Sequence, residues 1–200
     1  TQRLIEDFPQ HYPLYSEKSY TYNEITQYNR NNLLWRDSSV DGVKTGFTEA
    51  ARYCLVSSAQ RGEMRVISVV LGTPSEEARV ASSQSLINYA FNFYETHRLY
   101  AAGEVIETER VYKGDRETVD LALASDLYVT IPRGEYDTMS ASMKLPTTLI
   151  APLATGDAIG QVVISLGDDV LVERDLMPLA PVSSGNLLQR AMDEVRLWFE

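Results

Sequence analysis

The second half of the sequence is built from short segments in which apolar and polar residues alternate, and this pattern constrains the fold most. Seven such segments follow residue 100: RVY, VDLAL, LYVTI, SASMKL, TLIAPL, QVVISL and VLVERDLM. Turn-forming stretches that contain glycine, such as Lys113-Gly114-Asp115, separate several of them. Short strands at regular spacing are typical of an all-β sandwich or a small barrel. We therefore predict a small β-rich domain, sandwich-like, over residues 97–184.

The first half has longer apolar runs. Residues 43–45, 53–59 and 65–71 are β-prone, and Gly62 supplies a turn residue that tolerates positive φ between the last two. We predict three adjacent antiparallel strands. The segment RVISVVL at 65–71 is apolar almost throughout, which favours a central strand with both faces covered.

A helix is predicted to follow this sheet, from about residue 75 to residue 94. Ser75 is a suitable N-cap, and Glu76 and Glu77 lie in the first turn, beside the positive end of the helix dipole. One apolar face is expected to pack on the sheet, formed by Val80, Ser83, Ile87, Ala90, Phe91 and Tyr94 and widened by Leu86, Tyr89 and Phe93. Upstream, the segment NRNNLLW is expected to bury Leu33, Leu34 and Trp35. Residues 1–96 thus form an α/β domain with an antiparallel sheet and helices.

The last segment, NLLQRAMDEVRLWFE at 186–200, has the spacing of an amphipathic helix, with Asn186 as its N-cap. We assign residues 185–200 to a separate C-terminal helix. Trp198 and Phe199 on its apolar side suit a membrane interface. The alternative is a helix that packs this side on its own protein, and the acidic Asp193, Glu194 and Glu200 weaken attraction to anionic lipid.

Composition excludes several classes of function. The chain has 28 acidic and 18 basic residues and a net charge of −10, which argues against nucleic acid as a partner and favours simple solubility. Cys54 is the sole cysteine, so no internal disulfide can form, and His11 and His97 lie far apart in the sequence. We expect neither a metal site nor a cofactor. The chain begins with neither an initiator methionine nor a signal peptide, and we expect it to be part of a longer sequence.

Lys44, Thr45 and Gly46 form a tripeptide with a chemical rationale. The lysine places a cation beside an anionic substrate, the threonine hydroxyl can bond a carboxylate, and the glycine lets a substrate backbone approach the strand without a Cβ in the way. The same tripeptide belongs to the motif set of serine β-lactamases and penicillin-binding proteins. Taken alone, it is also explained by a surface lysine followed by a turn glycine.

Longer motifs give the tripeptide a context. The segments NRNNLLW, VDGVKTGFT, YCLVSSAQRGEMRVISVVLG, ALASDLYVTIPRG and IAPLATGDAIGQVV occur in this order. In order and spacing they resemble the latter part of the low-molecular-mass penicillin-binding proteins, D-alanyl-D-alanine carboxypeptidases of the penicillin-binding protein 5 type. The resemblance covers nearly the whole chain. It implies that residues 1–96 are the C-terminal part of a transpeptidase-like catalytic domain, of the fold shared with serine β-lactamases.

The resemblance also implies roles for five residues. Lys44 would supply positive charge beside the nucleophile, Thr45 would bond the substrate carboxylate, and Gly46 would admit the substrate backbone. The backbone N–H of Phe47 would be an oxyanion-hole donor, although several relatives have histidine at this position. Arg79 would bind the terminal carboxylate of the substrate. The alternative for Arg79 is a solvated arginine on the helix surface.

The nucleophile motif of the family, Ser-x-x-Lys on a helix, is absent from this sequence. The residues three positions before its four lysines are Tyr15, Asp41, Arg110 and Ala141. The segment Ser184-Gly185-Asn186 has the form of a second family motif, but its position favours a helix cap. We expect an N-terminal portion of the same enzyme to supply the nucleophile. The fragment alone is then expected to be inactive, and poorly soluble or partly unfolded.

By this resemblance, the whole enzyme would remove the terminal D-alanine of peptidoglycan pentapeptides through a serine acyl-enzyme. It would bind peptidoglycan stem peptides and β-lactam antibiotics, take part in cell-wall synthesis and cell shape, and lie in the periplasm at the outer face of the cytoplasmic membrane, held there by residues 186–200. Two alternatives stay open. A serine β-lactamase is disfavoured by the β-rich domain, and a non-catalytic module would dock cell-wall strands or a partner protein.

Overall fold

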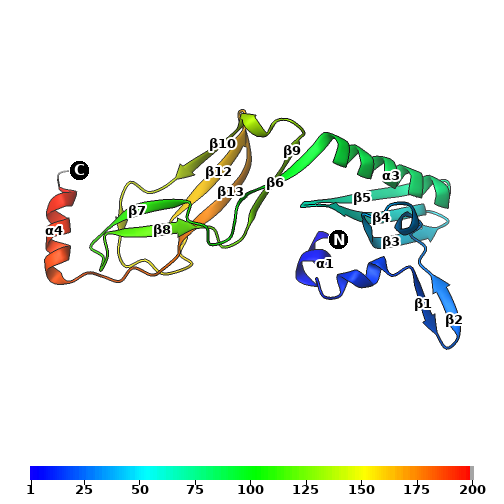
Figure 1. Ribbon diagram of the computed structural model, residues 1–200, viewed down its shortest axis with the longest axis horizontal. Coiled ribbons are helices and arrows are strands. Elements are labelled where there is room, and N and C mark those ends of the chain that lie inside the picture. The colour runs from blue at the N-terminus through cyan, green and yellow to red at the C-terminus, as the bar shows by residue number, and fades with distance from the viewer. Residues whose placement is uncertain (199–200) are drawn as a thin grey trace. The chain divides into compact units, whose positions relative to one another are not determined.

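A computed structural model describes residues 1–198 of the chain (Figure 1). By its internal contacts the chain divides after Glu95 into two compact units, residues 1–95 and residues 96–200. The sequence patterns had suggested a boundary after residue 96. Strand β6 (Tyr94–Tyr100) carries the chain from the first unit into the second.

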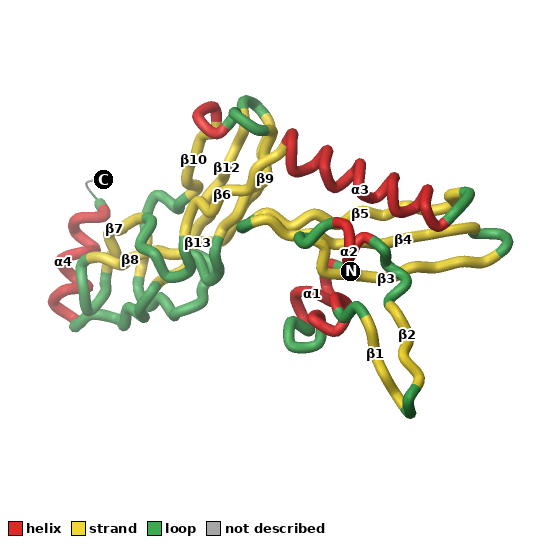
Figure 2. The backbone as a smooth tube through the Cα atoms, turned by 45° about the vertical axis from the view of Figure 1, so that its right-hand side comes forward, coloured by secondary structure: helices red, strands yellow, loops and turns green. Residues whose placement is uncertain are grey.

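The first unit is a three-stranded antiparallel sheet with one long helix on it (Figures 1 and 2). The three predicted strands and their order, β3-β4-β5, are confirmed. A short hairpin of β1 and β2 projects from the unit, and its strand residues are all exposed. The elements in chain order are α1 (Gln2–Asp7), the 3₁₀ helix η1 (Tyr12–Ser16), β1 (Ser19–Tyr22), β2 (Ile25–Tyr28), α2 (Leu33–Arg36), β3 (Val40–Thr48), β4 (Arg52–Arg61), β5 (Met64–Thr73) and α3 (Glu76–Phe93).

Helix α3 starts and packs as its sequence predicts. The side chain of Ser75 accepts a hydrogen bond from the backbone N–H of Ala78 at 3.1 Å, so the N-cap is confirmed. Val80, Ile87 and Phe91 are buried against the sheet. The core of the first unit consists of Leu33, Leu34, Val40, Leu55, Ala59, Met64, Val80, Ile87 and Phe91.

Three predictions about burial in this unit are wrong. Leu86, Tyr89 and Phe93 are 47%, 54% and 58% exposed, because they lie outside the face that α3 turns to the sheet. Trp35 is 47% exposed, unlike its buried neighbours Leu33 and Leu34. Strand β5 is an edge strand of the described sheet and not a central one, and its outward row, Ile67, Val69 and Leu71, is exposed. Helix α3 covers a single face of the sheet, so alternate residues of an apolar run stay uncovered.

The second unit is rich in strands, and each of the seven predicted segments contains one. A six-stranded sheet has the order β10-β12-β13-β8-β7-β11, and β6 pairs with β9 in a second sheet. The segment TLIAPL contributes just the two residues of β11, which run parallel to β7. The elements are β7 (Glu107–Tyr112), β8 (Thr118–Ala122), β9 (Leu127–Pro132), the 3₁₀ helix η2 (Tyr136–Thr138), β10 (Met139–Lys144), β11 (Leu149–Ile150), β12 (Gly160–Leu166), β13 (Asp169–Pro178) and α4 (Leu187–Leu197).

The core of the second unit lies between these strands. It gathers buried side chains from both sheets and from the segments that connect their strands. Its members are Val111, Val119, Leu121, Leu123, Leu127, Val129, Leu149, Ala151, Leu153, Val162, Ile164, Leu176 and Val182. The unit thus has a hydrophobic core of its own.

Helix α4 is capped as predicted. The side chain of Asn186 accepts from the N–H of Gln189, the side chain of Gln189 accepts from the N–H of Asn186, and both bonds are 2.9 Å. This confirms that Ser184-Gly185-Asn186 is a helix start. None of the residues of α4 is buried, and Phe199 and Glu200 lie outside the described residues. In the part of the chain that the structure covers, no helix has the length and apolar character needed to cross a membrane.

Candidate active site

Strand β3 presents Lys44, Thr45, Gly46 and Phe47 along one edge of the first unit's sheet. Its neighbour is β4, with Lys44 opposite Val56 and Gly46 opposite Cys54. Within residues 1–198, no strand pairs with its other edge. Alternate N–H and C=O groups of β3 therefore point outward without a strand partner, which is the arrangement that accepts an added strand.

Lys44 is exposed, and its ammonium group contacts the backbone carbonyl of the adjacent Thr45. No acidic side chain among residues 1–198 forms an ion pair with it. An unpaired ammonium at a strand edge attracts anions, and its charge is available to a ligand that lies along the edge.

Gly46 is not required by the packing of this chain. A Cβ placed on it would meet just one heavy atom within 4 Å, the Cβ of Cys54 at 3.8 Å, which is an ordinary contact. Its backbone does not have a positive φ. Gly42, two residues before Lys44, differs in this respect, because a Cβ there would lie 2.8 Å from the Tyr12 hydroxyl. The absence of a side chain at Gly46 instead leaves the exposed edge of β3 smooth.

Buried polar groups hold the beginning of β3. Asn31 is 1% exposed, and its amide donates to the Gly42 carbonyl at 2.8 Å. The Tyr12 hydroxyl donates to Asp41 at 2.9 Å, and Arg65 donates to the other oxygen of Asp41 at 2.7 Å. Burial, together with the hydrogen bond to Asp41, raises the pKa of Tyr12 to about 12, so the phenol stays a donor at neutral pH. These contacts fix the strand just before Lys44.

Arg79, which lies on α3, contacts the same strand. Its side chain is 2% exposed, and Nη1 donates to the Gly46 carbonyl at 3.3 Å. Nη2 lies 3.5 Å from Glu76, and the guanidinium lies 5.6 Å from the centre of the Tyr53 ring. The alternative of a solvated arginine is therefore wrong. The structure brings Arg79 to Gly46 from a position 33 residues away in the sequence.

An aromatic pair flanks the end of the motif. The rings of Phe47 and Tyr53 lie 4.5 Å apart and tilted by 40°, and Phe47 is 56% exposed. Such tilted pairs are favourable contacts. The Phe47 side chain thus faces solvent, while its backbone N–H lies on the same strand as Lys44.

The site residues proposed from the sequence thus lie on, or directly under, one strand. Sequence reasoning missed the residues that hold the strand: Tyr12, Asn31, Asp41, Tyr53 and Arg65. Asn31 and Asp41 lie inside segments singled out for their resemblance to the family, but their burial, which marks them as supports, is not visible in the sequence.

Comparisons with known proteins identify the family. The model of the D-alanyl-D-alanine carboxypeptidase family matches residues 1–75, and the model of the penicillin-binding protein 5 C-terminal domain matches residues 94–184. The chain belongs to the D-alanyl-D-alanine carboxypeptidase family. It is 39% identical to the D-alanyl-D-alanine carboxypeptidase DacA of Escherichia coli K12 over 200 residues, which are 99% of this chain and 50% of that protein. DacC of the same organism is also 39% identical, over 98% of this chain and 50% of its own length.

Solved structures give the same result. The structure of penicillin-binding protein 5 from Haemophilus influenzae matches with a TM-score of 0.83 and 40% identity, over 91% of this chain and 54% of that one. The mixed α/β fold of this D-alanyl-D-alanine carboxypeptidase family member is therefore of the penicillin-binding protein 5 type. The chain spans about half the length of the curated relatives it matches.

Proposed function

We propose that this chain supplies one wall of the active site of a serine-type D-Ala-D-Ala carboxypeptidase. The observation that supports it most directly is the edge of β3, which carries an unpaired ammonium at Lys44 and an uncovered glycine at Gly46. A D-Ala-D-Ala stem peptide of peptidoglycan would add to this edge as an extended strand, and the N–H of Phe47 would contribute to the oxyanion hole.

Thr45 would bond the carboxylate of the substrate, and Lys44 would supply positive charge beside it and beside the nucleophile. One guanidinium nitrogen of Arg79 donates a hydrogen bond to the Gly46 carbonyl of the same strand. A buried positive charge is poorly screened, so it favours an anion on the other side of the strand even without direct contact. Direct binding of the carboxylate by Arg79 stays a prediction.

The serine nucleophile would come from another stretch of the same enzyme, because the sequence contains no Ser-x-x-Lys. The uncovered apolar rows of the first unit support this idea. Val69 and Leu71 on β5 and Leu86, Tyr89 and Phe93 on α3 are exposed, and exposed apolar side chains grouped in this way are typical of a contact with further polypeptide. An N-terminal portion of the enzyme would cover these rows and place its nucleophile opposite β3.

Labelling of the full-length enzyme with a fluorescent penicillin tests the proposal, because β-lactams would acylate the same serine. The wild-type enzyme is expected to label, and Lys44→Ala is expected to label at least ~100-fold more slowly, since the change removes charge beside the reacting groups. Lys18→Ala, which changes an exposed lysine of the same unit, serves as the matched control and should label normally. The 200-residue chain alone should not label.

Gly46→Ala sharpens the same experiment. We expect an unchanged unfolding temperature, because the added methyl group meets no close atom of the chain. Removal of D-alanine from a pentapeptide should nevertheless fall by about 10-fold or more, because a 1 Å displacement of the substrate is enough for such a loss. Labelling that is independent of Lys44, or full activity of Gly46→Ala, would contradict the assignment of β3 as the substrate edge.

For the C-terminal helix, we propose that it holds the enzyme on the outer face of the cytoplasmic membrane, in the periplasm. Leu187, Leu188 and Trp198 are 84%, 75% and 84% exposed, so the helix does not bury its apolar side in the described part of the protein. The backbone N–H of Lys113 donates to Asp193 at 2.6 Å, and its ammonium group pairs with Glu194. This pairing neutralises part of the acidic charge that would repel anionic lipid.

Co-sedimentation with vesicles of phosphatidylglycerol and phosphatidylethanolamine tests the membrane proposal. Enzyme that lacks residues 186–200, or carries Leu188→Asp, is expected to stay in the supernatant, while Arg190→Gln as a control for the polar side binds at most a few-fold more weakly. Equal binding with and without residues 186–200 would remove the anchor from the proposal.

A further inference from the structure

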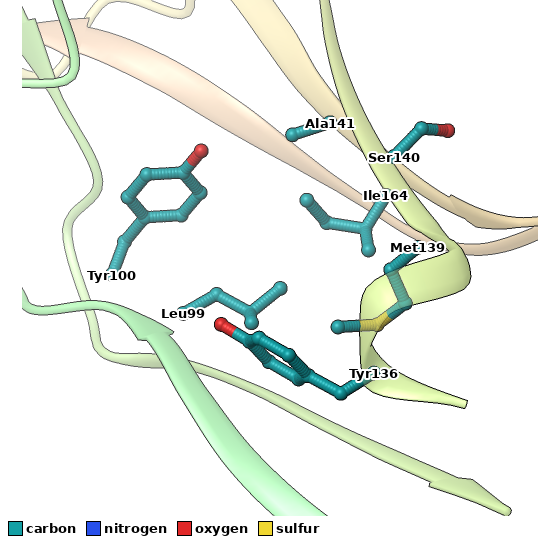
Figure 3. A pocket seen from close by; sticks show the side chains of 7 residues that line it. All are labelled: Leu99, Tyr100, Tyr136, Met139, Ser140, Ala141 and Ile164. Atoms are coloured by element: carbon teal, nitrogen blue, oxygen red, sulfur yellow. The ribbon is translucent and has the colours of Figure 1, made fainter. Parts of the chain in front are cut away.

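A pocket in the second unit lies beside an unpaired strand edge. It has a volume of about 220 Å³ and is lined by Leu99 and Tyr100 of β6, Tyr136 of η2, Met139, Ser140 and Ala141 of β10, and Ile164 of β12. Figure 3 shows Leu99 and Tyr100 on one side of the pocket and Met139 and Ile164 opposite. None of these lining residues is charged, so the pocket suits an uncharged side chain and disfavours a carboxylate or an ammonium group.

Strand β10 forms one wall of this pocket, and it ends the six-stranded sheet. It pairs with β12, from Met139 opposite Leu166 to Lys144 opposite Gln161. Among the described residues no strand lies on its other side. Ser140 to Lys144 are all exposed. The outward N–H and C=O groups of such an edge select an extended backbone as their partner.

The sequence of β10 does not protect this edge in the usual way. Exposed edge strands normally carry charged residues, proline or a bulge that discourage pairing with another chain. Here MSASMK has three small residues in its middle, Ser140 to Ser142, and a single charge, Lys144, which is paired with Glu173 at 2.7 Å. The register of β10 with β12 is unbroken from Met139 to Lys144. An added backbone thus meets little steric or electrostatic resistance along β10.

Charge near the pocket indicates which occupant fits. Glu135 and Asp137 flank Tyr136 and are exposed, and the chain as a whole carries a net charge of −10. A second copy of this chain would bring equal negative charge to the contact, which disfavours self-association. A segment with a basic residue beside an apolar one would place its positive charge near Glu135 and Asp137 and its apolar side chain in the uncharged pocket.

We propose that the β10 edge and its pocket form a docking site for an extended peptide segment of a partner protein. The segment would add to the sheet as a strand beside β10, insert one large apolar side chain between Tyr100, Tyr136 and Met139, and place a basic residue near Glu135 and Asp137. In this mode of recognition the main chain supplies affinity and the pocket supplies specificity. The site is separate in the sequence from the β3 edge and does not depend on the carboxypeptidase activity.

The test uses full-length enzyme and five synthetic peptides, acetyl-Lys-Thr-X-Thr-Val-Lys-amide, in which X is leucine, methionine, phenylalanine, alanine or aspartate. Hydrogen–deuterium exchange, followed by mass spectrometry at millimolar peptide, reports strand addition directly. The peptides with leucine, methionine or phenylalanine are expected to slow exchange in residues 139–144 at least 3-fold. The alanine peptide should act more weakly, and the aspartate peptide should have no effect.

Two variants separate the pocket from the edge. Ala141→Leu fills the pocket with a side chain from β10 itself and is expected to weaken binding of the leucine peptide about 10-fold. Ala158→Leu, an equal change at an exposed position before β12, is the matched control and should bind normally. Unfolding temperature is measured for both, so that a folding defect in Ala141→Leu is recognised. Tyr136→Ala, which enlarges the pocket instead of filling it, should also weaken binding of the leucine peptide.

Other outcomes would overturn the proposal. Equal protection by all five peptides would show that the pocket has no part in recognition. Protection by N-acetylglucosamine oligomers with no effect of any peptide would make the pocket a sugar site. If the wild-type enzyme forms concentration-dependent dimers and Ala141→Leu does not, the occupant of the site is a second copy of the chain. A complete lack of protection at residues 139–144 would remove the docking site altogether.

Discussion

The two units of this chain bury their apolar residues in different ways. The second unit encloses thirteen buried residues in one core, drawn from two sheets. The first unit has a core of nine, formed by α2, α3 and one face of a three-stranded sheet. On the first unit, large apolar side chains form rows that nothing in the described structure covers, such as Val69 and Leu71, which are 55% and 69% exposed.

This difference teaches how the units depend on other polypeptide. A sheet needs both of its apolar faces covered before it is stable in water, and a helix needs its apolar side covered as well. In the second unit these conditions are met by its own strands. In the first unit they are met for one face of the sheet and one side of α3. The first unit is thus expected to behave as half of a domain, and the second as a domain.

The largest expected effect is on folding of the separated units. Residues 96–200, expressed alone, should show a cooperative thermal transition by circular dichroism, because their core is complete. Residues 1–95 alone should be poorly soluble or melt without a cooperative transition, and in the whole 200-residue chain just the transition of the second unit is expected. A cooperative thermal transition of residues 1–95 would contradict the interpretation of the first unit as half of a domain.

A pair of leucines compares the two units at the level of single side chains. Leu121 in the second unit is 0% exposed and Leu71 on β5 is 69% exposed. Leu121→Ala should lower the free energy of unfolding of the second unit by about 3 kcal/mol, from lost burial and the cavity left behind. Leu71→Ala should change the unfolding free energy of the 200-residue chain by less than about 0.5 kcal/mol, because the one transition expected of that chain belongs to the second unit.

Urea unfolding of the chain and of the full-length enzyme measures both changes. In the full-length enzyme Leu71→Ala should cost about 1–3 kcal/mol, because the proposed N-terminal portion would bury that side chain. An equally small cost in both proteins would mean that the row on β5 stays exposed in the enzyme. The proposed cover of β5 would then be wrong.

The sequence predicted those features that depend on neighbouring residues. Local alternation, turn residues and capping chemistry predict strands β7–β13 of the second unit, strands β3–β5 of the first and the N-caps at Ser75 and Asn186, and the structure confirms them. The motif Lys44-Thr45-Gly46 was found because it is a contiguous tripeptide within longer family segments. Its place on an exposed strand edge agrees with what a substrate strand requires.

Features that depend on distant residues were not predicted. Helix α3 decides which side of β5 is covered, and the residues of the segment RVISVVL do not reveal which side that is. Arg79 is buried because it reaches the Gly46 carbonyl across 33 positions. Nothing in the sequence distinguishes Asn31 and Asp37 from other polar residues. Asn31 has its role because it donates to the Gly42 carbonyl, and Asp37 because it accepts from Gln84. Such contacts are settled by the fold and not by any local pattern.

A further expected effect concerns pH and again distinguishes the units. Asp37, at the end of α2, accepts hydrogen bonds from Ser39, from Gln84 of α3 at 2.9 Å and from Arg61 of β4 at 2.9 Å. Burial alone would raise its pKa, but these hydrogen bonds and the charge of Arg61 lower the pKa of Asp37 to about 2. In the unfolded chain an aspartate has a pKa of about 3.9.

Because the folded pKa is the lower one, the stabilisation is complete above about pH 4 and is lost as the pH falls toward 2. Asp37→Asn in the full-length enzyme should therefore cost about 2 kcal/mol of unfolding free energy at pH 6, and the difference from wild type should shrink steadily below pH 4. Asp168→Asn, at an exposed turn of the second unit, makes the same change of charge and should leave the stability of the first unit unaltered at each pH. A cost for Asp37→Asn that stays constant from pH 6 to pH 2 would show that shape, and not charge, links α3 to the start of β3.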